Sequence, residues 1–379
     1  MRRALFLLLV ACGSDSVEAP PSAGSPAVDA STAPRDAGNG ASDKPKEDAA
    51  PPPPPDPETR FLAIGDTGKG TAGQQAVADA MAPAADAIAT QYGCEIRTIE
   101  AIEKASDIDA VVICTPTDTH ADLIERFAKA GKAIFCEKPV DLSLDRVKAC
   151  LKAVEATNAK LMVGFNRRFD PHFRAVRAAI DEGQIGKVEM VTITSRDPGA
   201  PPAGYIKVSG GIFRDMTIHD FDMARFLLGE EIDSVMAQAS VLTDPEIGKL
   251  GDYDSASLIL TTSSGKQCVI SNSRRATYGY DQRIEVHGSL GSASAENQRP
   301  VSIEVATSAG YTRPPLHDFF MTRYTDAYAA EIAAFIAAIT KGAPISPNGQ
   351  DGLAALALSE AALLSLKEGR AVKLKEVAA

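Results

Sequence analysis

Between residues 109 and 165 the chain alternates short apolar runs with stretches of helical period. Continuous apolar runs of strand length are typical of strands buried on both faces, and apolar residues every three or four positions are typical of a packed helix. Gly131 suits the end of the first helix and Ser143 the start of the second. The pattern predicts strands at 109–116, 132–139 and 159–165, and helices at 120–131 and 142–158. This alternation predicts a parallel sheet that binds ligands at the carboxyl ends of its strands.

Beyond about residue 171 the rhythm changes, because several strand patterns follow one another without a helix between them. The predicted strands lie at 187–197, 234–243, 255–262, 267–273 and 282–288, and the predicted helices at 171–183, 213–229, 322–340 and 350–367. Consecutive strands indicate a largely antiparallel sheet. The sequence therefore predicts an α/β fold. A Rossmann-like domain (59–165), with an altered or truncated first βαβ unit, is followed by an α+β domain (166–379) with a large, mostly antiparallel sheet.

The first residues, MRRALFLLLVAC, place two arginines before an apolar run that is too short to span a membrane as a helix. Leu9 to Cys12 resembles the lipobox of bacterial lipoproteins, in which the matching cysteine, here Cys12, carries the lipid. The alternative is the apolar start of a cytosolic protein. Residues 13–58 are rich in Ala, Pro, Ser and Gly, which predicts a disordered linker. The first residues thus imply an envelope lipoprotein, whose contact with the membrane would be a lipid on Cys12, whereas the alternative implies a cytoplasmic protein, and the two localisations stay open.

Composition narrows the function without identifying it. The 379 residues are enough for about two domains, and a net charge of −11 argues against a nucleic-acid partner. None of the six cysteines forms a Cys-x-x-Cys pair, so a zinc ribbon or a redox motif is not indicated. Most of them lie in apolar runs, as buried free thiols of a reduced compartment do. That compartment conflicts with the exported protein that the first twelve residues indicate.

Residues 60–83 allow two interpretations. FLAIG (61–65) reads as a strand, and Gly68, Gly70 and Gly73 then give the G-x-G-x-x-G spacing of a dinucleotide-binding turn. The same stretch resembles the opening of a calcineurin-like or purple-acid-phosphatase-like metallophosphoesterase, with Asp66 as a metal ligand. The later ligand motifs of that family are absent, and one Asp cannot hold two metals, so a phosphatase function is disfavoured and no metal is expected.

Five ordered motifs carry a wider resemblance: ICTPTDTHADL (113–123), CEKPVDLS (136–143), GFNRRFDP (164–171), GGIFRDMTIHDFDMARFLLG (210–229) and YGYDQRIEVHG (278–288). Together they resemble the glucose–fructose oxidoreductase/inositol dehydrogenase (Gfo/Idh/MocA) family, and within it the myo-inositol 2-dehydrogenases, over about residues 84–374. The resemblance implies an NAD(P)-dependent oxidoreductase that moves a hydride between a cyclic polyol or sugar carbinol and the nicotinamide. NAD is the expected cofactor, with NADP as the alternative. Relatives of this kind are often dimers or tetramers through the open sheet face.

The resemblance also assigns the catalytic residues. It implies that Lys138 contacts the substrate hydroxyl near the nicotinamide, that His219 is the general base, and that Asp215 is the partner of His219. The spacing of Asp215 and His219 would place both on one face of a helix, one turn apart. The alternatives are a surface lysine and a core histidine beside an acid. A metal cluster of Asp215, His219, Asp220 and Asp222 is disfavoured because hydride transfer needs no metal.

The remaining candidates concern the cofactor and the substrate. Polar residues at the predicted strand ends and the family's cofactor loop give one set, completed by the N-terminal glycines and the acidic residue expected at the adenosine ribose: Gly68, Gly70, Asp79, Thr115, Pro116, Thr117, His120, Glu137, Lys138 and Asn166. Arg196 and Tyr280 are candidates for the substrate pocket, with ordinary surface or core roles as the alternative. Asp197 lies in a stretch where some relatives carry a substrate-binding His.

One segment departs from the family pattern. The strand that should end in the ribose-binding acid is missing, and VADA (77–80), which contains Asp79, falls in a helical run. Two alternatives to an active dehydrogenase follow: a sugar-binding pseudo-enzyme lipoprotein without a productive cofactor site, or a chimeric reading frame joined near VADA.

Overall fold

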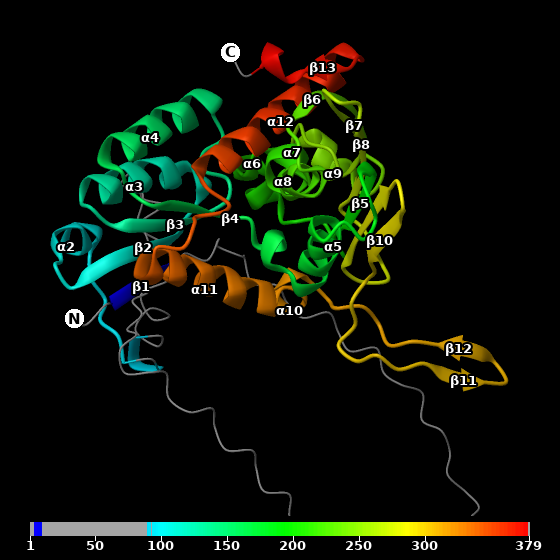
Figure 1. Ribbon diagram of the computed structural model, residues 1–379, viewed down its shortest axis with the longest axis horizontal. Helices are drawn as coiled ribbons and strands as arrows, with labels where there is room; N and C mark the ends of the chain where they lie inside the picture. The colour runs from blue at the N-terminus through cyan, green and yellow to red at the C-terminus, as the bar shows by residue number, and fades with distance from the viewer. Residues whose placement is uncertain (1–3, 10–88, 92, 378–379) are drawn as a thin grey trace, which may run out of the picture.

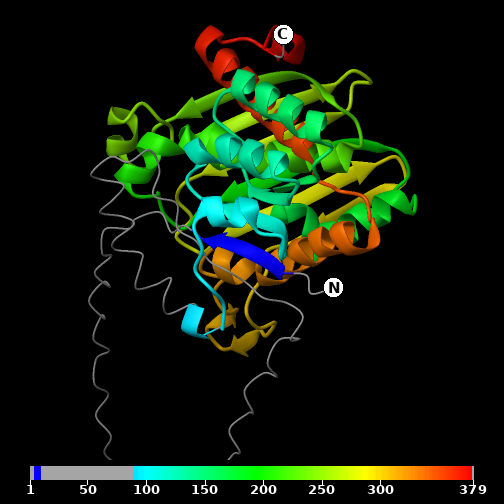
Figure 2. The ribbon, with the colours of Figure 1, turned by 90° about the vertical axis from the view of Figure 1, so that its left-hand side faces the viewer.

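The computed structural model describes residues 4–9, 89–91 and 93–377 (Figure 1). None of the helices in this described part is long and apolar enough to cross a membrane. Two large sheets organise it, with a long C-terminal helix running between them (Figures 1 and 2). The linker 13–58, Cys12 and the segment 60–83 lie outside the described residues, so the predictions made for them stay predictions.

The first sheet is parallel, with the strand order β1-β2-β3-β4. The predicted strands appear as β2 (Ile108–Cys114), β3 (Ala133–Glu137) and β4 (Leu161–Gly164). The crossover helices are α3 (Thr117–Lys129) and α4 (Leu144–Thr157), preceded by the short α2 (Ile99–Lys104). Ser143 caps α4 as expected. Helix α3 begins at Thr117, three residues before the predicted start, because the chain turns into the helix directly after Pro116.

The edge strand of this sheet differs from the prediction. β1 is formed by Ala4–Leu9 and pairs in parallel with β2, so the apolar run interpreted as an export signal occupies the place expected for FLAIG (61–65). An uninterrupted apolar run suits a strand of a parallel sheet as well as it suits a signal segment, and its pattern alone does not separate the two.

Side chains of the first sheet point alternately into two apolar layers. Val111, Ile113 and Ile134 face α3 and α4, whereas Val112 and Phe135 face α11 (Thr325–Lys341), whose side chains cover the opposite face. The ring of Phe335 on α11 meets that of Phe135 edge to face, with centroids 5.8 Å apart. Helix α11, which lies in the segment predicted as the second domain, thus covers one face of the first sheet, and the domain boundary at residue 165 stays a prediction.

The second sheet has the strand order β10-β9-β5-β8-β7-β6-β13 and is mostly antiparallel, as predicted. Its central strands are β5 (Val188–Arg196), β6 (Ile232–Ser240), β7 (Ser255–Thr262), β8 (Gln267–Ser273) and β9 (Asp281–Gly288). One central pairing, β5 with β8, is parallel. The edge strands β10 (Gly291–Ala295) and β13 (Val372–Lys373) extend the sheet, while β11 (Val305–Thr307) and β12 (Gly310–Thr312) form a separate projecting hairpin (Figure 1).

The helix predicted at 213–229 is divided at Met216 into α7 (Gly211–Asp215) and α8 (Thr217–Leu228). α8 packs on β5 and β8, and α12 (Gly349–Glu368) packs on α8, α4 and β6, so both helices lie between the sheets. The other helices are α5 (Pro171–Asp181), α6 (Ala203–Ser209), α9 (Pro245–Lys249) and α10 (Phe320–Arg323), with a 3₁₀ turn, η1 (Asn166–Phe169), after β4 and another, η2 (Leu374–Glu376), at the end. This arrangement sets α7 and α8 against the carboxyl edge of the first sheet.

Candidate active site

Lys138 and Asp215 meet where the end of β3 faces the end of α7. The Lys138 ammonium donates to the backbone carbonyl of Asp215 at 2.8 Å and to its carboxylate Oδ1 at 3.3 Å. Tyr205, on α6, donates its hydroxyl to the same Oδ1 at 2.8 Å. Both members of the ion pair are largely buried, and this strengthens the attraction between their charges. The structure thus holds a cation at the carboxyl edge of the parallel sheet.

His219 lies in the first turn of α8, beside this pair. Its Nδ1 is buried and has no hydrogen-bond partner among the described residues, and its ring packs edge to face on Phe165, with centroids 6.2 Å apart. Burial, followed by the positive charges of Lys138 and Arg167, lowers the pKa of His219 well below its ordinary value. The imidazole is therefore neutral near pH 7, as a general base must be.

The expected Asp215–His219 pair does not form. Asp215 ends α7 and His219 lies in α8, so no continuous helix carries the two residues on one face. The Asp215 carboxylate instead accepts hydrogen bonds from Lys138 and Tyr205 and lies 3.6 Å from the guanidinium of Arg274. The structure brings Lys138, Asp215 and His219 close together, but the partners of Asp215 are Lys138, Tyr205 and Arg274 and not His219.

Behind His219, the next residue on α8 is held in a closed network. Asp220 is fully buried, and its Oδ1 accepts from Arg167 at 2.5 Å and from Ser195 at 2.6 Å. Its Oδ2 accepts from Asn272 at 2.7 Å, and Asn272 in turn accepts from Thr217 at 2.7 Å. Every oxygen of this carboxylate has a donor, so Asp220 fixes α8 against β5 and β8.

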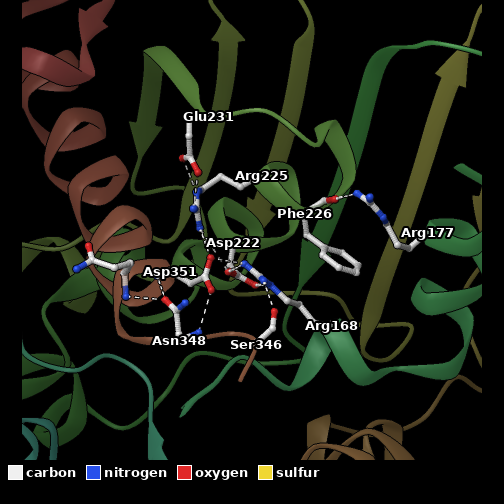
Figure 3. Close-up of polar contacts among 10 residues, drawn as sticks. Arg168, Arg177, Asp222, Arg225, Phe226, Glu231, Ser346, Asn348 and Asp351 are labelled. Atoms are coloured by element: carbon white, nitrogen blue, oxygen red, sulfur yellow. Dashed lines mark hydrogen bonds and ion pairs between the residues drawn. The ribbon is translucent and has the colours of Figure 1, made fainter. Parts of the chain in front are cut away.

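A second network fixes α8 to the start of α12 (Figure 3). Arg168 donates two hydrogen bonds to Asp222, of 2.7 and 2.6 Å, and one to Asp351, of 3.0 Å. Arg225 reaches the same Asp351 oxygen at 3.0 Å. Asp351 and Asn348 form the capping box of α12. The two arginines of the NRRF motif thus hold two aspartates on either side of the His219 helix turn.

The two predicted pocket residues, Arg196 and Tyr280, lie in different surroundings. The Ser195 side chain faces α8, so strand alternation turns the next side chain, that of Arg196, to the open face of the sheet, where it bonds to Tyr278 at 3.1 Å. Arg196 therefore lies on the far side of the sheet from His219. Tyr280 is buried among Phe319 and Tyr324. Burial, followed by the neighbouring Tyr324, raises the pKa of its hydroxyl well above the ordinary value, and the charges of Arg167 and Asp197 also act on it.

Asp197 follows β5 and faces this site. Burial raises the pKa of its carboxyl to about 7, while Arg274 opposes the shift and the charge of Asp215 adds to it. Its side chain accepts no hydrogen bond from any residue in the described ranges. An acid with an open acceptor near Asp215 and Tyr280 can bind hydroxyl groups.

The comparisons with known proteins match this arrangement. The family described as an oxidoreductase family with an NAD-binding Rossmann fold matches residues 60–165, and the GFO/IDH/MocA C-terminal domain matches residues 173–294. The inositol 2-dehydrogenase of Rhizobium meliloti is 76% identical over 299 residues, which cover 79% of this chain and 91% of that protein. The chain belongs to the Gfo/Idh/MocA oxidoreductase family.

Other relatives agree. The myo-inositol 2-dehydrogenase of Thermotoga maritima is 49% identical over 72% of this chain and 81% of its own length. The structure of a myo-inositol dehydrogenase from Corynebacterium glutamicum matches with a TM-score of 0.77 and 40% identity, covering 84% of this chain and 92% of that one. That of scyllo-inositol dehydrogenase from Lactobacillus casei, with bound NAD(H) and scyllo-inositol, matches with a TM-score of 0.73 and 26% identity, covering 84% and 92%.

The family match changes the interpretation of residues 60–83. The Rossmann match begins at residue 60, whereas the sequence motifs indicated the family from about residue 84. FLAIG and the glycines at 68, 70 and 73 therefore lie within the matched oxidoreductase domain. The comparisons give no support to the metallophosphoesterase resemblance, and no group of acidic, His or Cys residues in the described part could hold a metal ion.

The described half of the nucleotide site fits a dinucleotide. Thr115, Pro116 and Thr117 lead from β2 into α3, where Pro116 caps the helix without a side-chain acceptor and leaves the first N–H groups available. Glu137 follows on β3, and a Cβ at Gly164 would lie 2.9 Å from its Oε2, so the glycine leaves room for this carboxyl. Asn166 comes directly after β4. Gly68, Gly70 and Asp79 lie outside the described residues.

His120 has a different role from the one predicted. It is buried, and its Nδ1 and Nε2 each lie 2.7 Å from a backbone carbonyl, of Pro139 and Thr115 respectively. Its side chain therefore ties the Lys138–Pro139 turn to the Thr115 loop and does not line the edge where a nucleotide binds. The predicted helix began at His120, but α3 starts earlier and turns this side chain inward.

Sequence reasoning missed Tyr205 and Arg274, both of which contact Asp215. Tyr205 lies between the predicted strand at 187–197 and the predicted helix at 213–229, and Arg274 directly follows the predicted strand at 267–273; neither belongs to a motif. Their positions depend on contacts between distant segments. A signal was available in the alternation along β8, which turns Asn272 and then Arg274 inward and leaves Arg275 exposed.

Proposed function

We propose that the chain oxidises one carbinol of a myo-inositol-like cyclic polyol with NAD⁺. The observation that carries the proposal is the Lys138–Asp215 ion pair beside a neutral, unpartnered His219 at the carboxyl edge of a parallel sheet. The names of the relatives at 76% and 49% identity support the polyol, and the described half of the nucleotide site supports the cofactor. The high identity of these relatives disfavours the pseudo-enzyme, and the Rossmann match over residues 60–165, which runs through VADA, disfavours the chimeric frame.

The residues of the chain would divide the reaction as follows. His219 removes the hydroxyl proton, because its lowered pKa keeps the ring neutral and able to accept. Lys138 donates a hydrogen bond to the hydroxyl oxygen and stabilises the charge that develops on it. Bound NAD⁺ supplies the hydride acceptor. Asp215 and Tyr205 hold the Lys138 ammonium in place, and Phe165 packs against the base and excludes water from it.

The substrate would be held by its other hydroxyl groups. A cyclic polyol presents a ring of hydroxyls, each a donor and an acceptor, and these need open polar partners in a largely buried site. Asp197, whose carboxyl feels the charges of Arg274 and Asp215, and the neighbouring Tyr280 would supply such groups. Thr115, Pro116, Thr117, Glu137, Lys138 and Asn166 would hold the cofactor. NAD rather than NADP is proposed because the solved relative carries NAD(H).

Initial rates with the full chain test this function. Myo-inositol and scyllo-inositol are each offered with NAD⁺ and with NADP⁺, and NADH or NADPH formation is followed by absorbance. We expect turnover of myo-inositol with NAD⁺ and a lower kcat/KM with NADP⁺. Absence of turnover, together with a melting temperature that NAD⁺ does not raise, would contradict the proposal, since a ligand that binds the native state stabilises it.

Two predictions about the whole protein remain open to simple measurements. The open face of the second sheet exposes Met190, Met236 and Ile259, and we infer that a homo-oligomer forms through it. Light scattering of the full chain should then give a mass above that of one chain. For localisation, we infer an envelope lipoprotein from the sequence of residues 1–12, although the structure pairs Ala4–Leu9 with β2. Labelling with a radioactive fatty acid decides between the two, because a lipid on Cys12 requires that the signal before it be removed.

A further inference from the structure

Arg274 is a buried cation that the reaction proposed above does not use. It follows β8 and is 1% exposed, the largest of the side chains that are almost completely buried among the described residues. Its Nη2 lies 3.6 Å from Asp215 Oδ2 and 3.4 Å from Asp252 Oδ2. Its Nε is buried without a partner in the described part of the chain. Burying a guanidinium costs free energy, so a cation in this position calls for a role.

Asp252 anchors the guanidinium from the opposite side. Its Oδ1 accepts from the backbone N–H of Ile212, in the first turn of α7, at 2.9 Å. A Cβ at Gly211 would lie 2.7 Å from this oxygen, and the φ of Gly211 is +82°, so only glycine fits there without strain. The carboxylate of Asp252 is thus fixed against the start of α7, and Arg274 links it to Asp215 at the end of the same helix.

The two oxygens of Asp215 are divided between two kinds of partner. Oδ1 accepts from Lys138 at 3.3 Å and from Tyr205 at 2.8 Å, whereas Oδ2 faces Arg274. A carboxylate held at one oxygen can rotate about its last bond, which has a broad and shallow energy profile. A cation fixed at the second oxygen restricts that rotation and therefore fixes the direction in which Lys138 points.

We propose that Arg274 is a positioning residue for the oxidoreductase reaction, which orients the Asp215 carboxylate and through it the Lys138 ammonium. This inference rests on the proposed function. Asp252, Arg274, Asp215 and Lys138 form a line of alternating charges from the start of α7 to the reacting hydroxyl. In this proposal Arg274 has no contact with substrate or cofactor, and its effect on Lys138 passes through Asp215.

The first test replaces Arg274 by Met, which fills a similar volume without the charge, and uses Arg275→Met as the matched control. Arg275 is the next residue, is exposed and lies on the other side of the strand. We expect kcat with myo-inositol and NAD⁺ to fall about 10²-fold in Arg274→Met, as a small misplacement of a catalytic group does. We expect the KM for NAD⁺ to stay unchanged and Arg275→Met to behave as the wild type does.

The deuterium isotope effect separates positioning from loss of folded enzyme. With substrate deuterated at the oxidised carbon, the effect on kcat should rise in Arg274→Met, because hydride transfer then limits the rate. A fall in kcat with an unchanged isotope effect would mean that part of the protein is simply unfolded, and would overturn the proposal. Wild-type kcat in Arg274→Met would overturn it as well.

A double variant tests whether the effect passes through Asp215. Asp215→Asn with Arg274→Met should lose no more activity than Asp215→Asn alone, whereas additive losses would contradict the proposal. If Arg274→Met does not fold, Arg274→Lys and Asp252→Asn take its place, with the same isotope criterion. An inactive wild type would overturn the proposed function and this inference together, and an active wild type with unaffected variants would overturn this inference alone.

Discussion

The two sides of the α8 helix are built in opposite ways. On the supporting side, Asp220 and Asp222 are fully buried, and every carboxylate oxygen receives a hydrogen bond from the NRRF arginines or from neighbouring polar side chains. On the reacting side, His219 has a buried ring nitrogen without a partner among the described residues. The helix is thus firmly held on one side and chemically open on the other.

The difference between the two sides of α8 shows which polar groups are free to bind a ligand. A satisfied buried network stabilises the fold and has nothing left to offer a ligand, whereas an unsatisfied buried atom costs stability until a ligand pairs with it. The supporting side holds the helix turn that carries His219, and the reacting side leaves the His219 ring free to contact the polyol and the cofactor. Substitutions on the two sides should therefore act on different quantities: activity on one, stability on the other.

Removing the base should give the largest effect. His219→Ala is expected to lower kcat/KM for the polyol by about 10²–10⁴-fold, because general base catalysis typically contributes that much. The melting temperature should fall little or rise, since an unpaired buried nitrogen is removed. His287→Ala is the control, because the His287 side chain is 58% exposed on β9. Equal activities of the two variants would contradict the role of His219.

Substitutions on the supporting side of α8 should lower the free energy of unfolding. Asp222→Ala leaves Arg168 as a buried cation without its main partner, and we expect unfolding by denaturant to show a loss of about 3–5 kcal/mol. Asp181→Ala is the control, because Asp181 pairs with Arg177 on the surface, where a loss of about 1 kcal/mol or less is typical. The distinction between the two sides would fail if both variants lost the same stability.

Glu331 is a buried carboxyl without a cation beside it among the described residues, so its replacement should stabilise the protein, whereas the replacement of Asp222 should destabilise it. Burial, followed by the charge of Glu137, raises the pKa of Glu331 on α11 to about 9. The native state then keeps a proton that the unfolded state releases above its lower pKa, so stability falls as the pH rises between these two values. Glu331→Gln removes this penalty and should stabilise the protein by roughly 2 kcal/mol at about pH 8, with little effect at about pH 4. Thermal melts at the two pH values decide, and a destabilised variant at the higher pH would refute the explanation.

The smallest effect concerns the electrostatics of the base. The charge of Lys138 is one cause of the lowered pKa of His219, so Lys138→Met should raise that pKa. NMR titration of the histidine ring resonances measures it, with Lys129→Met at the exposed end of α3 as the control. A pKa of His219 that stays unchanged in Lys138→Met would mean that burial and the charge of Arg167 cause the shift without Lys138.

The sequence predicts the sheets well because their signals are local. β2, β3 and β4 are continuous apolar runs, and the strand pattern from residue 187 onward gives the second sheet. The site motifs are equally local, so Lys138, Asp215 and His219 were found together. The features that the sequence did not predict depend on tertiary contacts. They are the helix break at Met216, the buried side chain of His120, the position of Arg196 on the open face of the sheet and the ion pair of Asp215 with Lys138. No sequence spacing encodes those partners.

Hydride transfer itself can be observed directly. Myo-inositol deuterated at the carbon that carries the reacting hydroxyl is incubated with NAD⁺ and the full chain, and the reduced cofactor is isolated and examined by mass spectrometry and NMR. The proposed function predicts one deuterium on C4 of the nicotinamide for each molecule of ketone formed, and about 10²–10⁴-fold less deuterated cofactor with His219→Ala in the same time. Reduced cofactor without deuterium, or no reduced cofactor at all, would contradict it.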